Sequence, residues 1–190
     1  MDLSAISTTN IALVVAVLIV VGVGIWLFVS KRRTDRLRTQ FGSAEYARAV
    51  KEGGGQRKAE AVLGERADRV EALHIRELAQ GDRTRFVDSW TKVQARFVDS
   101  PGGAVTDADQ LLGDVMSTRG YPVGDFEQRA ADISVDHPLV LENYRAAHKS
   151  ALLQTQGKAS TEDLRQAMIH YRTLFEELVR EPEMARAKGA

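Results

Sequence analysis

The sequence predicts an all-α protein with one N-terminal transmembrane helix, a basic helical stalk and a C-terminal bundle of about four to five helices. Residues 11–29 form an unbroken apolar run of 19 residues. Beyond it, apolar residues recur at spacings of three and four, which is typical of amphipathic helices. Eight of the twelve aromatic residues lie between positions 83 and 180, so we expect the main core there.

The chain divides into segments by composition, and about 160 residues remain after the apolar run, enough for one modest domain. We expect a short tail at 1–10, a transmembrane helix at 11–29, a basic juxtamembrane stalk at 30–82, a helical bundle at 83–180 and a disordered tail at 181–190.

The apolar run is long enough to cross a bilayer. At about 1.5 Å per residue, a helix of this length spans roughly 28 Å, close to the hydrocarbon thickness. Trp26 and Phe28 lie near its C-terminal end, where aromatic rings favour the membrane interface. A cleaved signal peptide is the weaker reading, because the preceding flank holds Asp2 but no base, and no Ala-x-Ala site follows.

A basic flank after the run predicts its orientation, because basic residues resist translocation and stay in the cytoplasm. We expect a single pass through a membrane, N-terminus out, with residues 30–190 in the cytoplasm. If the topology is reversed, the chain is instead an envelope-facing factor. The flanking residues are Lys31, Arg32, Arg33, Arg36 and Arg38.

Charge is distributed unevenly along a chain whose net charge is zero. Residues 31–59 hold nine bases and three acids, a net charge of +6, whereas residues 60–190 carry a net charge of −5. The basic part adjoins the apolar run, so the lipid bilayer and its anionic head groups are expected partners. Nucleic acid is not expected, because the larger part of the chain is acidic.

The stalk reads as three helical pieces. The first continues from the apolar run to about Phe41 and breaks at Gly42. A short helix then ends at the glycines 53–55, and a third covers about 56–73. Because large apolar residues are few here, we expect a stalk or a loosely packed subdomain. The glycines, followed by Arg57 and Lys58, are interpreted as a hinge rather than a phosphate cradle, since no strand or Walker pattern accompanies them.

The bundle begins with a helix that Asp82 is expected to cap. Its apolar stripe has spacings of four, three and four residues, so these side chains share one face. That helix stops near Ser100, and Pro101 is placed to begin a second helix that ends at Gly120.

Three more helices follow. Asp125 is expected to cap the first, Pro138 opens the second, and Ser160 with Asp163 resembles a capping box for the third. We expect a bundle core that includes Phe86, Trp90, Phe97, Leu112, Phe126, Tyr144, Tyr171 and Phe175.

No metal site or cofactor is expected. There is no cysteine, and none of the four histidines has a partner at the three- or four-residue spacing that brings two ligands together on a helix. Asp132, Asp136 and His137 are the one candidate acid–base cluster, with Ser134 as the nearest hydroxyl. An Asp–His–Pro sequence at a helix start is more simply a cap, and no Gly-x-Ser-x-Gly elbow is present.

A homodimer through the membrane helix is a weaker expectation. Ala12 and Ala16 form one small-xxx-small pair, whereas Gly22 and Gly24 do not make a GxxxG motif.

The stretches RGYPVGDFEQRAADISVDHPLVLENYRAAH and STEDLRQAMIHYRTLFEELV resemble a family of uncharacterised bacterial single-pass membrane proteins with a C-terminal helical domain. The resemblance implies a bacterial protein with a self-contained helical module, so the membrane that we expect is the bacterial plasma (inner) membrane. It carries over no catalytic residue.

These observations favour a membrane-anchored interaction or scaffold module that binds an unidentified protein partner, and not an enzyme. The alternative is a membrane-bound enzyme with a non-standard site near Asp136 and His137.

Overall fold

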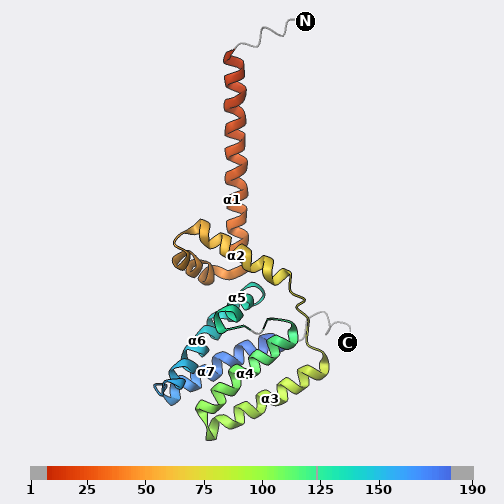
Figure 1. The fold of residues 1–190 in the computed structure, drawn as a ribbon, viewed down its shortest axis with the longest axis vertical. Coiled ribbons are helices and arrows are strands. Elements are labelled where there is room, and N and C mark those ends of the chain that lie inside the picture. The colour runs from red at the N-terminus through yellow and green to blue at the C-terminus, as the bar shows by residue number, and fades with distance from the viewer. Residues whose placement is uncertain (1–7, 123, 181–190) are drawn as a thin grey trace.

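The protein is all-helical in a computed structural model that describes residues 8–122 and 124–180, as the sequence predicts (Figure 1). The described residues contain no strand. Their helices are α1 (Thr8–Gly53), α2 (Gln56–Glu71), α3 (Gln80–Asp99), α4 (Pro101–Arg119), α5 (Phe126–Asp136), α6 (Pro138–Thr155) and α7 (Thr161–Val179). The tail expected at 181–190 lies outside the described residues, as do residues 1–7.

The first part of α1 stands away from the rest of the molecule (Figure 1). Every side chain from residue 15 to residue 29 is exposed, although all but two of these residues are large and apolar or alanine. Among the described helices, this one is long and apolar enough to cross a membrane. Its length, composition and position therefore fit a membrane span or a signal sequence.

The C-terminal part of α1 bends sharply at Gly42 and forms a hairpin with α2. Gly42 has φ 74° and ψ 162°, a conformation that glycine adopts readily and other residues avoid. The break expected at this position is therefore present. The hairpin encloses a small hydrophobic cluster, called the juxtamembrane core below, which consists of Leu37, Phe41, Tyr46, Ala49, Ala59 and Leu63.

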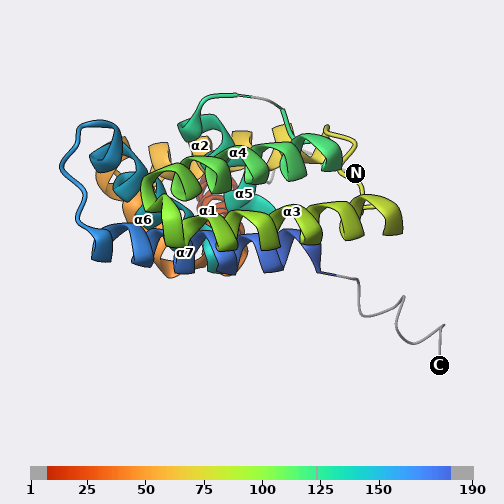
Figure 2. The same ribbon diagram turned by 90° about the horizontal axis from the view of Figure 1, so that it is seen from below.

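The larger core lies among α3 to α7 (Figure 2). The antiparallel pairs α3–α4 and α6–α7 meet through α4 and α7, and α5 packs on α6. Trp90 stacks on Phe175 with 4.8 Å between ring centroids. Of the eight aromatic and aliphatic residues expected in this core, Phe97 and Phe126 are half-buried against it. The fully buried ones are Phe86, Trp90, Leu112, Tyr144, Tyr171 and Phe175.

Several helix ends follow from local sequence. The Asp125 carboxylate accepts a hydrogen bond from the backbone N–H of Gln128 at 2.8 Å, and Ser160 and Asp163 form a capping box. Gly120 ends α4 with φ 101°. The prediction for Asp82 is wrong: α3 begins two residues earlier, at Gln80, so Asp82 lies in its first turn.

Candidate functional site

The acid–base cluster considered from the sequence does not converge on one point. Asp132 pairs with Arg69, whereas Asp136 accepts a hydrogen bond from the Tyr121 hydroxyl at 2.7 Å. The Ser134 hydroxyl donates to a carbonyl of its own helix, that of residue 131. Each group thus has its own structural partner, and none is placed to pass a proton to another.

His137 lies between a cation and an anion. Its Nε2 is 3.3 Å from Arg119 Nη1, which can only donate, and its Nδ1 is 3.2 Å from Glu177 Oε1, which accepts. These contacts fit a neutral imidazole that carries its proton on Nδ1. Burial, followed by the Arg119 charge, lowers the pKa of His137 from its usual range.

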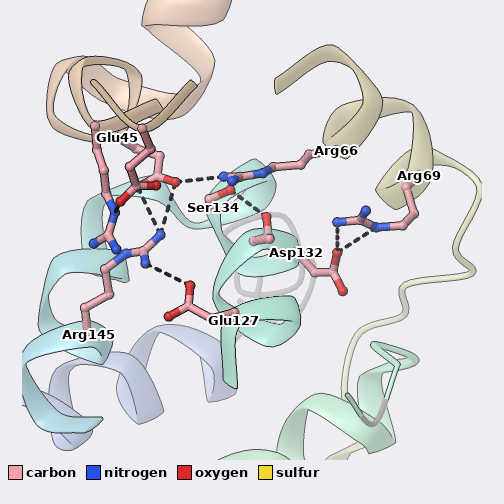
Figure 3. A network of polar contacts seen from close by, with 10 residues as sticks. Glu45, Arg66, Arg69, Glu127, Asp132, Ser134 and Arg145 are labelled. Carbon is pink, nitrogen blue, oxygen red and sulfur yellow. Dashed lines mark hydrogen bonds and ion pairs between the residues drawn. The ribbon is translucent and has the colours of Figure 1, made fainter. Parts of the chain in front are cut away.

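A group of ion pairs instead joins the α1–α2 hairpin to the bundle (Figure 3). Glu45 in α1 is 3% exposed. Its carboxylate accepts from Arg66 of α2 at 2.8 Å and from Arg145 of α6 at 3.1 and 3.2 Å. Arg145 also lies 3.5 Å from Glu127 of α5. One buried carboxylate therefore connects three helices.

A second ion pair lies beside the first. Asp132 of α5 is fully buried, and its Oδ1 accepts two hydrogen bonds from Arg69 of α2, at 2.8 and 3.1 Å. The Gln128 amide also donates to this carboxylate at 2.9 Å. Val135, on the same helix, packs against the juxtamembrane core. Ion pairs and apolar contact together hold the hairpin on the bundle.

The basic flank behaves differently from these paired arginines. Its five side chains are exposed. Within the described part of the chain, none of them forms an ion pair with a carboxylate. Arg32 and Arg38 lie over the aromatic rings of Phe28 and Tyr46, so the flank contacts the protein without a carboxylate partner.

Two hollows lie near this flank. One, of about 650 Å³, lies between α1, α2 and the end of α5, and its rim mixes Arg33 and Arg36 with Asp68 and Asp136. The other, of about 570 Å³, lies between α1 and the start of α2. It is called the interfacial hollow below and is lined by Trp26, Ser30, Thr34, Gly54, Gly55, Gln56, Arg57, Lys58 and Glu60.

Sequence reasoning missed the ion pairs and singled out the flank. Glu45 and Arg145 are 100 positions apart, and neither stands in a motif. The sequence predicts a hinge at the glycines 53–55, and in the structure Gly54, Gly55, Arg57 and Lys58 line the interfacial hollow. Among the described residues, no three His, Cys, Asp or Glu side chains are grouped to hold a metal ion.

No protein-family model, curated protein or solved structure matches this chain. The family resemblance drawn from the sequence stays a prediction.

Proposed function

We propose that this chain is a single-pass membrane protein whose helical bundle is an interaction module held at the inner face of a bacterial plasma membrane. The observation that carries this proposal is the continuity of α1. One helix runs from the exposed apolar segment into the juxtamembrane core, where Leu37 and Phe41 are buried. Membrane insertion of that segment attaches the bundle at a fixed place.

The contact between hairpin and bundle supports a fixed rather than a tethered module. Glu45 and Asp132 are buried ion-pair partners, and breaking such a pair is costly. The bundle is therefore held in one orientation relative to α1. An anchor of this kind raises the local concentration of the module near membrane-bound partners.

The basic flank supports the inward orientation. Five exposed cations without carboxylate partners follow the apolar segment directly. Such residues are retained on the cytoplasmic side.

A binding role is favoured over a catalytic one by the separate partners of Asp132, Asp136 and His137. For protein recognition, a helical groove or an exposed part of the Phe126–Tyr144 region is the expected surface, and Tyr144 itself is fully buried. The bundle presents a shallow groove between α3 and α7 instead, which Phe97, Met168 and Ile169 line. Neither of these helices packs against α1 within the described part of the chain.

Topology reporters fused after Ala190 test the orientation. We expect fluorescence from a fluorescent protein that matures in the cytoplasm, and no activity from a phosphatase that works only outside. Phosphatase activity without fluorescence contradicts the proposal and makes the chain an envelope-facing factor.

The binding role is tested by a paired substitution, Asp136→Asn with His137→Asn. We expect reduced thermal stability with the cellular phenotype of a deletion strain still complemented. Loss of complementation by a variant that remains folded supports the enzyme alternative.

A further inference from the structure

The interfacial hollow is built by two segments about thirty positions apart. Trp26, Ser30 and Thr34 are four residues apart on α1, so they lie on one face of that helix. Arg57 and Lys58, in the first turn of α2, face them across the hollow. The guanidinium of Arg57 lies 6.0 Å from the centroid of the Trp26 ring.

The fold holds the start of α2 firmly against α1. The Gln56 amide donates to the Thr34 hydroxyl at 3.2 Å and to Glu60 at 2.8 Å, and Thr34 donates to Glu60 at 2.6 Å. Ala59 and Leu63, on the next turns of α2, are buried in the juxtamembrane core. The hollow is therefore a preformed feature of the hairpin.

Glu60 is the one carboxylate in the lining, and its Oε1 accepts hydrogen bonds from the Thr34 and Tyr46 hydroxyls and the Gln56 amide. Burial acts to raise its pKa, but hydrogen bonds donated by Thr34, Gln56 and Tyr46 outweigh burial and lower it. Within the described chain, neither Arg57 nor Lys58 forms an ion pair with Glu60 or any other carboxylate. Two cations in the hollow are thus free to bind an external anion.

The position of the hollow along α1 indicates which anion is available. Trp26 belongs to the apolar run, and the basic flank begins one residue after Ser30. When the run spans a bilayer, this part of α1 lies where hydrocarbon gives way to head groups. Anything that enters the hollow from the bilayer side meets an aromatic ring first and two cations next.

We propose that the interfacial hollow binds the head group of an anionic phospholipid, with its phosphate between Arg57 and Lys58 and its acyl chains along the exposed apolar face of α1. This inference rests on the proposed membrane function. It goes beyond a general attraction of the basic flank to lipid, because it assigns the selectivity to two residues contributed by α2.

Bromolipid quenching of Trp26 fluorescence tests the assignment in the full chain. The protein is reconstituted in phosphatidylcholine vesicles with dibrominated phosphatidylglycerol or dibrominated phosphatidylcholine. Bromine quenches only tryptophans that the lipid contacts, and Trp90 is buried in the bundle, where it supplies a constant background. The ratio of quenching by the two lipids measures the preference for the anionic one beside Trp26.

The variant Arg57→Gln/Lys58→Gln removes the two cations of the hollow. Its matched control, Lys31→Gln/Arg32→Gln, removes two exposed cations at the same level of α1 that do not line the hollow. We expect the preference for phosphatidylglycerol to fall by about tenfold in the first variant, because Arg57 and Lys58 hold the phosphate beside Trp26. In the control we expect it to fall by less than about twofold, because Lys31 and Arg32 lie outside the hollow and do not hold the head group.

If both variants lose the preference for phosphatidylglycerol equally, the hollow does not bind the head group, and the preference comes from diffuse attraction of lipid to the basic residues. No preference in the wild-type chain overturns it as well, while quenching by both lipids still supports insertion. Absence of quenching by either lipid shows that α1 is not in the bilayer, and the proposed function fails with the inference.

Discussion

Two groups of arginines in this chain are used in opposite ways. Arg69 and Arg145 connect the hairpin to the bundle through buried Asp132 and Glu45, and Arg66 joins α2 to the same Glu45 within the hairpin. The arginines close to the apolar segment are exposed and have no carboxylate partner within the described chain. The exposed group comprises Arg32, Arg33, Arg36, Arg38 and Arg57.

The difference shows that an arginine stabilises the fold when its carboxylate partner is buried, and that the residue type alone does not decide this. Removing one member of a buried pair leaves an uncompensated charge in a site that water does not reach, and this costs several kcal/mol. An exposed arginine remains hydrated whether or not it is paired, so its removal changes the free energy of unfolding little. The first group therefore stabilises the fold, and the second is available to partners.

The largest effect is expected for Glu45→Ala. The substitution leaves Arg66 and Arg145 without their shared carboxylate, so we expect a loss of about 3 kcal/mol in the free energy of unfolding. Urea unfolding of the detergent-solubilised chain, followed by the fluorescence of its two tryptophans, measures it. Glu52→Ala is the control, because its pair with Arg48 is exposed and should contribute less than about 0.5 kcal/mol. Equal stability of the two variants would contradict the comparison.

A smaller effect is expected for the pair of Asp132 with Arg69. Arg69 is 41% exposed, so part of its charge stays hydrated when the partner is lost. We expect Asp132→Asn to cost about 2 kcal/mol, and a double-mutant cycle with Arg69→Gln to show a coupling free energy of about 1 kcal/mol. Strict additivity of the two substitutions would show that the pair does not hold α2 on α5.

The comparison also shows what the sequence can predict. The spacing of Phe86 and Trp90 indicates the buried face of α3, and Gly42 marks the bend in α1, because both signals are local. The burial of Glu45 is not local. It depends on Arg145, 100 positions away, and on the way the hairpin folds back.

Two further features, the juxtamembrane core and the interfacial hollow, depend on both local sequence and the way the chain folds back. Because large apolar residues are few in this stretch, the sequence predicts a stalk or a loosely packed subdomain. It does not predict the juxtamembrane core in which Leu37 and Phe41 are buried. The interfacial hollow forms because the turn at Gly54 and Gly55 brings the start of α2 back beside Trp26. No spacing in the sequence predicts this reversal of the chain.

The pH dependence of stability tests the neutral state of His137. Its folded pKa is lowered, so the unfolded chain binds the proton more readily. Stability is therefore present above the unfolded value of about 6.5 and falls as the pH drops from about 7 to about 5.5. His137→Asn retains a donor toward Glu177, and we expect a smaller fall in the urea midpoint over this range.

His148, whose pKa burial also lowers, remains in that variant, so the pH dependence is reduced and not abolished. A midpoint that falls as steeply in the variant as in the wild type would mean that His137 accepts a proton in the folded state, between Arg119 and Glu177.

The smallest effect on stability is expected for substitutions in the basic flank, which should have the largest effect on the orientation of the chain in the membrane. Replacing all five residues of the basic flank by glutamine breaks no ion pair within the described chain, so we expect the free energy of unfolding to change by less than about 1 kcal/mol in total.

The same substitution removes the charge that retains this side of α1 in the cytoplasm. We therefore expect reporters fused after Ala190 to show mixed orientation, with phosphatase activity appearing beside reduced fluorescence. Glutamine at Arg85, Lys92, Arg96, Arg165 and Arg172, all exposed, removes an equal charge from the bundle and should leave the orientation unchanged. If the flank variant unfolds easily while keeping one orientation, its arginines belong with the structural group, and the distinction drawn here between the two groups is wrong.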